Sequence, residues 1–263
     1  MDETTIRLAA FFGLFMAFAL AETVTPRRRP TFKRWGRWFT NWAISITNTV
    51  LTGLMKGLLG LTAALAAVDA ADLGVGLFNR IDLPVFIEVI VVFILLDFAI
   101  WFQHLISHKI PILWRLHRVH HADRDFDVTT AIRFHPIEIG LSMLFKVALV
   151  YALGAPVIAV ILFEIILNGA AMFNHANIRL PQEWDQRLRR VIVTPDMHRV
   201  HHSTDRREHD TNYGFNLSIW DRLFRTYTAQ PRLGHEDMRI GLAEYQTTDP
   251  TNLPWSLKFP FLK

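Results

Sequence analysis

The stretch FIEVIVVFILLDFAIWFQHLISH, residues 86–108, decides the fold of this chain. Its first part, Phe86 to Phe102, is rich in Ile, Val, Leu and Phe and runs directly into His104. Because a helix needs about 20 apolar residues to cross a bilayer, this part is a candidate membrane-spanning helix. His104 and His108 then share one helical face, since residues four apart are neighbours on a helix.

Three further apolar segments predict the rest of a membrane bundle. They are residues 6–21, 42–68 and 139–173, and the last contains Gly154-Ala155-Pro156 near its middle. This tripeptide indicates a turn, so residues 139–173 form either two full spans or a shallow re-entrant hairpin. Little of the chain shows the alternation typical of β-strands. The sequence therefore predicts an all-α integral membrane helical bundle of about four spans.

A run of basic residues follows the first apolar segment and orients the chain. The run consists of Arg27, Arg28, Arg29, Lys33, Arg34 and Arg37. We interpret it as a membrane-flanking loop that faces the cytoplasm and anionic headgroups, and no other signature points to nucleic acid. Counting spans from this loop places residues 101–136 and 175–263 on the same, cytoplasmic side. The protein is therefore expected to be a multi-pass membrane protein with its histidine motifs in the cytoplasm.

Histidine is the residue type that indicates chemistry. The chain has 12 histidines and no cysteine, which excludes disulfides, iron–sulfur clusters and thiolate zinc sites. Two identical His-x-x-His-His triplets accompany the His-x-x-x-His motif, at helical spacing among apolar residues and arginines, unlike a solvated His-rich tract. The candidate metal ligands are His104, His108, His117, His120, His121, His135, His175, His198, His201 and His202.

This set is too large for one metal ion. A zinc site takes three or four protein ligands, whereas two ions with four or five nitrogens each would use all these imidazoles. Within a triplet, residues three or four apart share a face, and the adjacent histidine lies about 100° round the helix, where it can reach a neighbouring ion. All-imidazole ligation suits Fe, Zn, Cu or Ni. The spacing thus predicts a di-metal centre without choosing the metal.

At these motifs the sequence resembles the fatty acid hydroxylase and sterol desaturase superfamily of membrane di-iron enzymes. The matching segments are HLISH (104–108), HRVHH (117–121), FHPIE (134–138), NHANI (174–178), MHRVHHS (197–203), NYG (212–214) and WDRLF (220–224). The resemblance implies a membrane anchor capped by a cytosolic helical domain that holds two Fe ions. It implies ligands from the His-x-x-x-His motif, both triplets and His175, whereas His135 is either a ligand or a hydrogen-bond donor beside one.

The same resemblance implies the reaction. The enzyme would use O₂ to hydroxylate an aliphatic C–H bond of a lipid, either a fatty acyl chain, a sterol or an isoprenoid, which requires an oxidant that no side chain supplies. A desaturase of the same family starts with the same hydrogen abstraction, so motif spacing does not separate the two. A zinc-dependent membrane hydrolase would need a general base such as that of H-E-x-x-H, and a metal transporter would hold its ligands at mid-membrane. A recombinant preparation could carry zinc in place of iron.

Three further residues are candidate catalytic residues: Asp97, Glu164 and Asn174. Ionisable groups inside membrane spans are expensive and tend to be functional. For Asp97 and Glu164 we therefore favour bracing of a ligand histidine over polar contacts between helices. The acids that flank the triplets are interpreted as solvated loop carboxylates: Asp123, Asp125, Asp196 and Asp205.

Electrons are expected to come from a separate protein. The chain has no G-x-G-x-x-G motif after a strand and no cysteine for an iron–sulfur centre. We predict a reductase, ferredoxin-like or cytochrome-like donor that docks on the basic cytosolic face. The predicted organisation is a membrane anchor at 1–84, a catalytic region at 85–230 and a C-terminal tail at 231–263.

Overall fold

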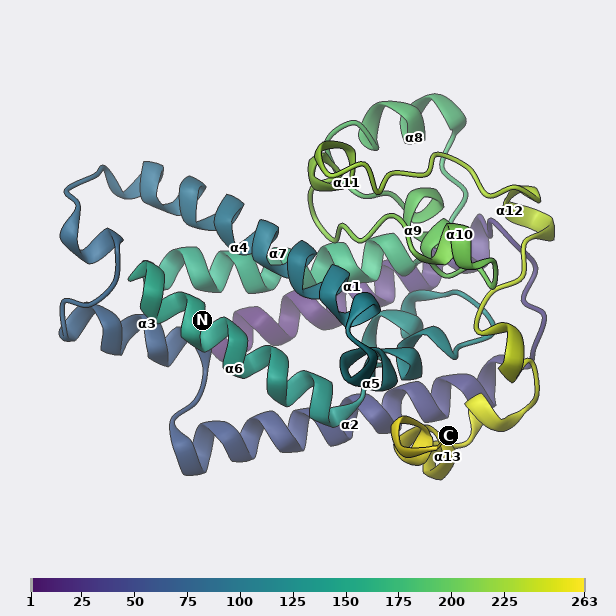
Figure 1. Ribbon diagram of the computed structural model, residues 1–263, viewed down its shortest axis with the longest axis horizontal. Coiled ribbons are helices and arrows are strands. Elements are labelled where there is room, and N and C mark those ends of the chain that lie inside the picture. The colour runs from purple at the N-terminus through teal and green to yellow at the C-terminus, as the bar shows by residue number, and fades with distance from the viewer. Residues whose placement is uncertain (1, 263) are drawn as a thin grey trace.

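The computed structural model describes residues 2–262, which form helices and connecting loops without a β-strand (Figure 1). The first seven α-helices are α1 (Glu3–Val24), α2 (Arg34–Leu59), α3 (Ala63–Asp72), α4 (Val85–Lys109), α5 (Pro111–His121), α6 (Pro136–Leu153) and α7 (Val157–His175). Short helices follow: α8 (Gln182–Leu188), α9 (Pro195–His201), α10 (Arg206–His209), α11 (Ile219–Leu223), α12 (Gly234–Asp237) and α13 (Leu253–Lys258). Five 3-10 helices complete this range: η1 (Phe78–Arg80), η2 (Val128–Ile132), η3 (Ala243–Tyr245), η4 (Asp249–Thr251) and η5 (Phe259–Phe261). The predicted all-α fold is confirmed.

Five helical segments between residues 2 and 262 are long and apolar enough to cross a membrane. They are α1, α2 together with α3, α4, α6 and α7. The segment 139–173 divides into α6 and α7 at the predicted turn, where Gly154 adopts a φ of 62°. A Cβ at Gly154 would lie 2.8 Å from the Val75 carbonyl oxygen, so this turn requires glycine. A multi-pass membrane protein is thereby confirmed.

The segment 42–68 and the basic loop before it differ from the prediction. The helix begins at Arg34, inside the predicted loop, and Arg37 is 1% exposed instead of facing headgroups. It ends at Leu59, after which Gly60 takes a φ of 62° and Thr62 caps α3 by accepting a hydrogen bond from the Leu65 amide at 3.1 Å. The second span is therefore a helix with a break.

The ends of the long helices that carry or support histidines meet at one end of the bundle, where the short helices form a cap (Figure 1). The Arg27 amide, after α1, donates to the Asn177 carbonyl, after α7, at 2.9 Å. At the start of α2, Arg37 pairs with Asp123, which follows α5. Residues of 101–136 and 175–263 also meet at this end, where Nε2 of His121 lies 3.1 Å from Nε2 of His201, whereas the cytoplasmic placement of this end stays a prediction.

Apolar packing holds the other end of the bundle together. Val92 and Leu96 of α4 pack in one buried cluster with Val150 of α6, Val160 and Phe163 of α7 and alanines of α3. Large apolar side chains on the outer faces of the spans are exposed, as expected for helices solvated by lipid. This packing leaves the polar end of the bundle free to build a site.

Candidate metal centre

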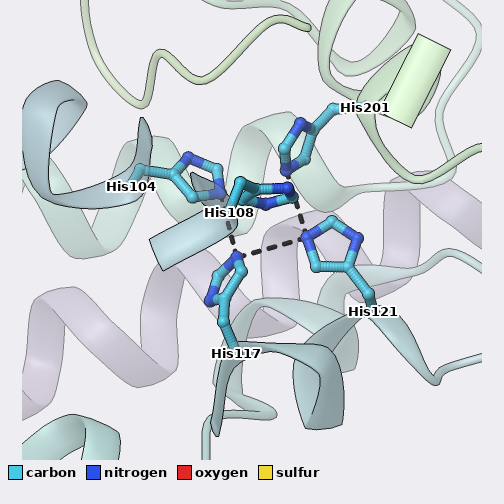
Figure 2. Close-up of side chains that lie close together, drawn as sticks. All are labelled: His104, His108, His117, His121 and His201. Atoms are coloured by element: carbon cyan, nitrogen blue, oxygen red, sulfur yellow. Dashed lines mark hydrogen bonds between the residues drawn. The ribbon is translucent and has the colours of Figure 1, made fainter. Parts of the chain in front are cut away.

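Nine of the ten predicted ligands lie together in two adjacent groups. His104, His108, His117, His121 and His201 form the first group, whose rings converge in Figure 2. His120, His175, His198 and His202 form the second group. Within each group, every histidine contributes one ring nitrogen, and these nitrogens all lie within 4.8 Å of one another. The structure thus brings together histidines from α4, α5, α7 and α9.

Each triplet divides its histidines between the two groups in the same way. In α5, His117 and His121 belong to the first group and His120 to the second. In and after α9, His198 and His202 belong to the second group and His201 to the first. The pair four residues apart shares a helical face, and the middle histidine points to the other group.

Burial keeps these imidazoles neutral, which is the form that binds metal. It lowers the pKa of His117 to about 3. It also holds the pKa of every other histidine of the two triplets well below the ordinary value; these are His120, His121, His198, His201 and His202. All of them therefore offer a nitrogen lone pair at neutral pH.

The contacts of the other ring nitrogens show where those lone pairs point. The Nδ1 atoms of His104, His201 and His175 lie 2.7, 2.6 and 2.7 Å from carbonyl oxygens of Tyr213, Thr211 and Ala171. A carbonyl only accepts hydrogen bonds, so each Nδ1 carries the proton and each Nε2 is bare. Every one of these bare Nε2 atoms points into its group.

Several Nε2 atoms lie close together within each group. The His104 and His117 Nε2 atoms are 3.0 Å apart, and Nε2 of His121 is 3.2 Å from His117 and 3.1 Å from His201 (Figure 2). In the second group, the His175 Nε2 atom lies 3.1 Å from those of both His120 and His198.

These spacings fit metal coordination. Two nitrogens at about 2.1 Å from one ion are about 3.0 Å apart at a right angle and about 3.4 Å apart at the tetrahedral angle. His104 and His117 both carry their proton on Nδ1, so their facing Nε2 lone pairs repel each other unless a cation lies between them. Both ring nitrogens of His108 and of His202 are also buried without a hydrogen-bond partner among the described residues, and an ion would supply one. The residues of both groups therefore fit a metal ion.

Glu138 supports the first group and was not singled out from the sequence. Its Oε1 atom accepts a hydrogen bond from Nδ1 of His117 at 2.6 Å, which is the carboxylate–histidine arrangement common behind metal ligands. Glu138 lies in the first turn of α6, within the matched FHPIE segment. Glu138 is 21 residues from His117, so no helical spacing in the sequence linked the two residues.

Asp97 does not brace a histidine directly, contrary to the expectation. Its carboxylate accepts hydrogen bonds from Asn216 Nδ2 at 2.8 Å, the Leu217 amide at 3.2 Å and Trp220 Nε1 at 2.8 Å. It thereby holds the loop 213–220, whose Tyr213 carbonyl receives the His104 proton. Its influence on the ligands passes through that loop.

Asp221 fixes the same loop from the other side, and sequence reasoning overlooked it. It accepts hydrogen bonds from the amides of Tyr213 and Gly214 at 2.9 and 2.8 Å and from Trp101 Nε1 at 3.0 Å. Asp221 is fully buried. Together the two aspartates anchor the loop 213–220 to α4, which fixes the position of the Tyr213 carbonyl.

Glu164 makes a polar contact between helices, which was the less favoured reading. Its carboxylate binds Lys146 of α6 at 2.7 Å and Arg7 of α1 at 2.9 Å. All three side chains line a cavity of about 480 Å³ that lies among α1, α2, α4, α6 and α7 and extends to His104 and His117. Glu164 therefore borders the cavity without touching a ligand.

Asn174 and His135 also lie outside the two groups. Asn174 directly precedes His175 in the chain, and its side chain donates a hydrogen bond to the Phe215 carbonyl at 3.1 Å. His135 caps α6 by accepting from the Ile137 amide at 3.2 Å, and its Nε2 atom lies 3.1 Å from the Leu257 carbonyl. Of the two roles left open for His135, ligand or hydrogen-bonding residue, these contacts fit the hydrogen-bonding one, at the start of α6.

The acids after the first triplet, Asp123 and Asp125, are buried, which corrects their interpretation as solvated carboxylates. Arg37 donates to both oxygens of Asp123, at 2.6 and 2.8 Å, and to Asp127 at 2.8 Å. Burial alone would raise the pKa of Asp123, but the Arg37 guanidinium lowers it to about 2. The Asp125 carboxylate instead accepts hydrogen bonds from the backbone amides of Thr31 and Phe32.

Around the second triplet the flanking acids differ from each other. Asp196 is largely buried and pairs with Arg199 and with Arg27. Asp205 is more exposed and caps α10 by accepting from the Arg207 amide. Only Asp205 thus resembles the expected loop carboxylate.

His209 is a further histidine beside the first group that the spacing argument missed. Its ring centroid lies 4.4 Å from that of His121 and 4.9 Å from those of His108 and Trp114. With His108 and Asp210 it forms a third cluster of possible ligands. It stands outside any triplet, so no motif indicated it.

The C-terminal tail and the N-terminal helices pack on the histidine-bearing helices. Arg133 donates to Asn41 of α2 and to the Pro250 carbonyl at 2.7 and 2.9 Å. Arg118 of the first triplet donates to the Phe259 carbonyl. The predicted boundaries near 84 and 230 stay a prediction, and contacts cross both of them.

Fold and site together define a class: a multi-pass membrane protein with two adjacent all-imidazole metal-binding groups. The model of the fatty acid hydroxylase family matches residues 89–226. The chain therefore belongs to the fatty acid hydroxylase family, as its motifs had indicated.

Curated relatives agree with this assignment. The chain is 30% identical over 235 residues to an ornithine lipid hydroxylase of Rhizobium tropici, covering 84% of this chain and 67% of that one. It is 32% and 29% identical to alkylglycerol monooxygenases of Xenopus tropicalis and Homo sapiens, matching 52% of this chain and 30% of each of them. These relatives are named as a hydroxylase and as monooxygenases, which confirms the prediction of an oxidoreductase. No solved structure gives a significant match.

Proposed function

We propose that this chain hydroxylates an aliphatic C–H bond of a membrane lipid with O₂, using two iron ions held by the two histidine groups. The observation that carries the proposal is the cavity of about 480 Å³ that reaches His104 and His117 from among the membrane helices. Its volume lies in the range of pockets that enclose small ligands. Iron and O₂ supply an oxidant strong enough for an unactivated carbon, which side chains lack.

The overall reaction sets what the site has to provide. The C–H bond becomes C–OH, the second oxygen atom leaves as water, and two electrons and two protons are consumed. The protein holds the Nε2 lone pairs of both groups inward and keeps the His117 proton on Nδ1 through Glu138. Phe134 stacks on His120 at 4.3 Å and Phe215 lies 5.0 Å from His104, so both rings exclude water beside the ligands.

The named relatives support a lipid as the substrate class. One is named for ornithine lipid and the others for alkylglycerol, and both names describe lipids with a polar end. The cavity wall here combines apolar side chains such as Phe11 and Ile100 with polar ones such as Asn48 and Gln103. We therefore propose a lipid that brings both apolar and polar groups into the cavity.

Electrons are proposed to arrive from a separate carrier at the cytoplasmic face. Trp114 lies 5.0 Å from His108 and 4.9 Å from His209 between ring centroids. It lines a surface hollow of about 310 Å³ together with His209, Arg118 and Arg206. Two arginines against one glutamate, Glu244, make the charge at this hollow basic, which suits an acidic carrier.

Metal analysis and product analysis test the proposal together. The protein is expressed with isotopically enriched iron, purified without oxygen in detergent, and examined by Mössbauer spectroscopy. We expect a coupled pair of irons in each chain. With a reductant and a membrane lipid extract under heavy-isotope O₂, one labelled oxygen atom should appear in a lipid product. A single tightly held zinc without iron uptake would refute the proposal, and a product that only loses hydrogen would point to desaturation.

A further inference from the structure

Exposed apolar side chains gather around α11, in the part of the cap that follows the second triplet. The Val191 carbonyl accepts a hydrogen bond from the Ser218 amide at 3.0 Å, so Val191 lies beside the start of α11. Four apolar side chains here have exposed fractions of 62%, 51%, 64% and 47%: Val191, Ile219, Leu223 and Phe224. We call these four residues, with the exposed Arg190 and Arg225, the α11 patch.

The α11 patch lies against the lipid-facing side of a span. Leu95, Phe98 and Phe102 of α4 are three and four residues apart and so share one helical face. Leu95 and Phe102 are exposed, whereas Phe98 is covered by Trp220 and Phe224, at 5.1 and 5.8 Å between ring centroids. A cap element therefore covers part of a helical face of α4 whose other apolar side chains are exposed.

The depth of α11 along α4 follows from Asp97. Trp220 Nε1 donates to Asp97 at 2.8 Å, and Asp97 lies seven residues before His104. At about 1.5 Å per residue, this contact is about 10 Å further along the helix axis than His104, toward the bundle core. It also precedes Phe102, where the apolar run of α4 ends. The start of α11 is thus level with the apolar part of the span.

The charges of the patch fit a particular lipid surface. Arg190 and Arg225 flank its apolar residues and are exposed, while the acid of α11, Asp221, is buried and hydrogen-bonded. Apolar side chains between cations are typical of segments that lie in the interface of a bilayer with anionic lipids. Long arginine side chains can reach the headgroups while the apolar residues contact acyl chains.

We propose that the α11 patch inserts into the leaflet on the metal-bearing side of the membrane and binds anionic headgroups. The cap then contacts the bilayer directly through α11, in addition to its attachment to the membrane-spanning helices. This contact seals the side of α4 next to the loop 213–220, which holds the Tyr213 carbonyl against His104. The occupant of the patch is lipid, and neither a second copy of the chain nor a protein partner is required.

Spin labelling tests this directly because the chain has no cysteine. Leu223→Cys carries a nitroxide in full-length, metal-loaded protein in nanodiscs that contain anionic phospholipid. Leu95→Cys provides a lipid-facing reference, and Leu233→Cys, beside α12 at the far end of the cap, an aqueous one (Figure 1). We expect the ratio of collisions with O₂ to collisions with a water-soluble nickel chelate to be several-fold higher at 223 than at 233, and close to that at 95.

A charge variant sharpens the same experiment. Arg190→Gln with Arg225→Gln should lower the collision ratio at 223 toward the aqueous value, and replacing anionic by zwitterionic lipid should do the same. A label at 223 as accessible to the chelate as the label at 233 would overturn the proposal. Dipolar broadening between labels at 223 would also overturn it, because a second copy would then cover the patch. The readout needs no turnover, so it is independent of the proposed hydroxylation.

Discussion

The two histidine groups are built from the same motif, yet their surroundings differ. His104 and His117 of the first group line the cavity that lies among the spans, and Glu138 behind His117 lines it as well. The second group does not border this cavity and is enclosed by aromatic rings, with Phe126 5.4 Å from His175 and 5.0 Å from His202 between centroids. We infer that substrate approaches the first group, because no histidine of the second group borders the cavity.

The largest expected effect comes from two neighbouring histidines that belong to different groups. His201→Ala should weaken the first group and His202→Ala the second, and each should remove one metal ion and abolish turnover, because both ions are needed. Metal content and Mössbauer spectra of the two variants should therefore show different remaining ions. Identical spectra would contradict the division of the triplet.

Arg37→Met should loosen both groups at once. Removal of one partner from a buried ion pair leaves an uncompensated charge and costs about 3–5 kcal/mol. Asp123 directly follows His121 and Ala122, so the end of α5 loses its anchor. Unfolding in mixed detergent measures the loss. Arg29→Met, at an exposed position of the same basic run, should stay within about 0.5 kcal/mol of the wild type.

Glu138→Gln should affect the first group alone. Loss of a carboxylate behind a ligand histidine typically lowers metal affinity or activity about 10- to 100-fold. Chelator competition and turnover measure this change. Glu164→Gln is the matched control because Glu164 borders the same cavity but pairs with Arg7 and Lys146. A similar loss of metal in both variants would argue against a specific role of Glu138.

His135→Ala should have the smallest effect and leave both groups loaded. Its imidazole caps α6, and loss of a helix cap costs about 1 kcal/mol. The midpoint of unfolding should fall slightly while metal content is retained. Loss of one ion per chain in this variant would return His135 to the ligand set.

Several features could be predicted from local spacing alone. The His-x-x-x-His motif and both triplets follow helical periodicity, so their shared faces were readable in the sequence. Apolar runs long enough to cross a bilayer, with Gly154 between two of them, indicated the spans and the turn. Each of these features depends on residues a few positions apart or on the composition of one continuous segment.

Tertiary structure alone decided which imidazoles meet. Spacing left open whether His117 pairs with His120 or His121, and the crossing of α5 with α4 and α9 settles the division between the groups. Arg37 looked like a headgroup-facing cation because nothing near it in the sequence is acidic, and its partner Asp123 is 86 residues away. Asp97 likewise finds its partners 119 to 123 residues away.

The sequence by itself thus determined the residue type of the candidate ligands, the membrane class and the helical faces, because each depends on short-range periodicity or composition. Only the tertiary structure decided the partners of buried charges, the role of His135 and the separation of a cavity-lining group from an enclosed one. The physical reason is that burial and pairing depend on distances between segments, which the packing of whole helices sets.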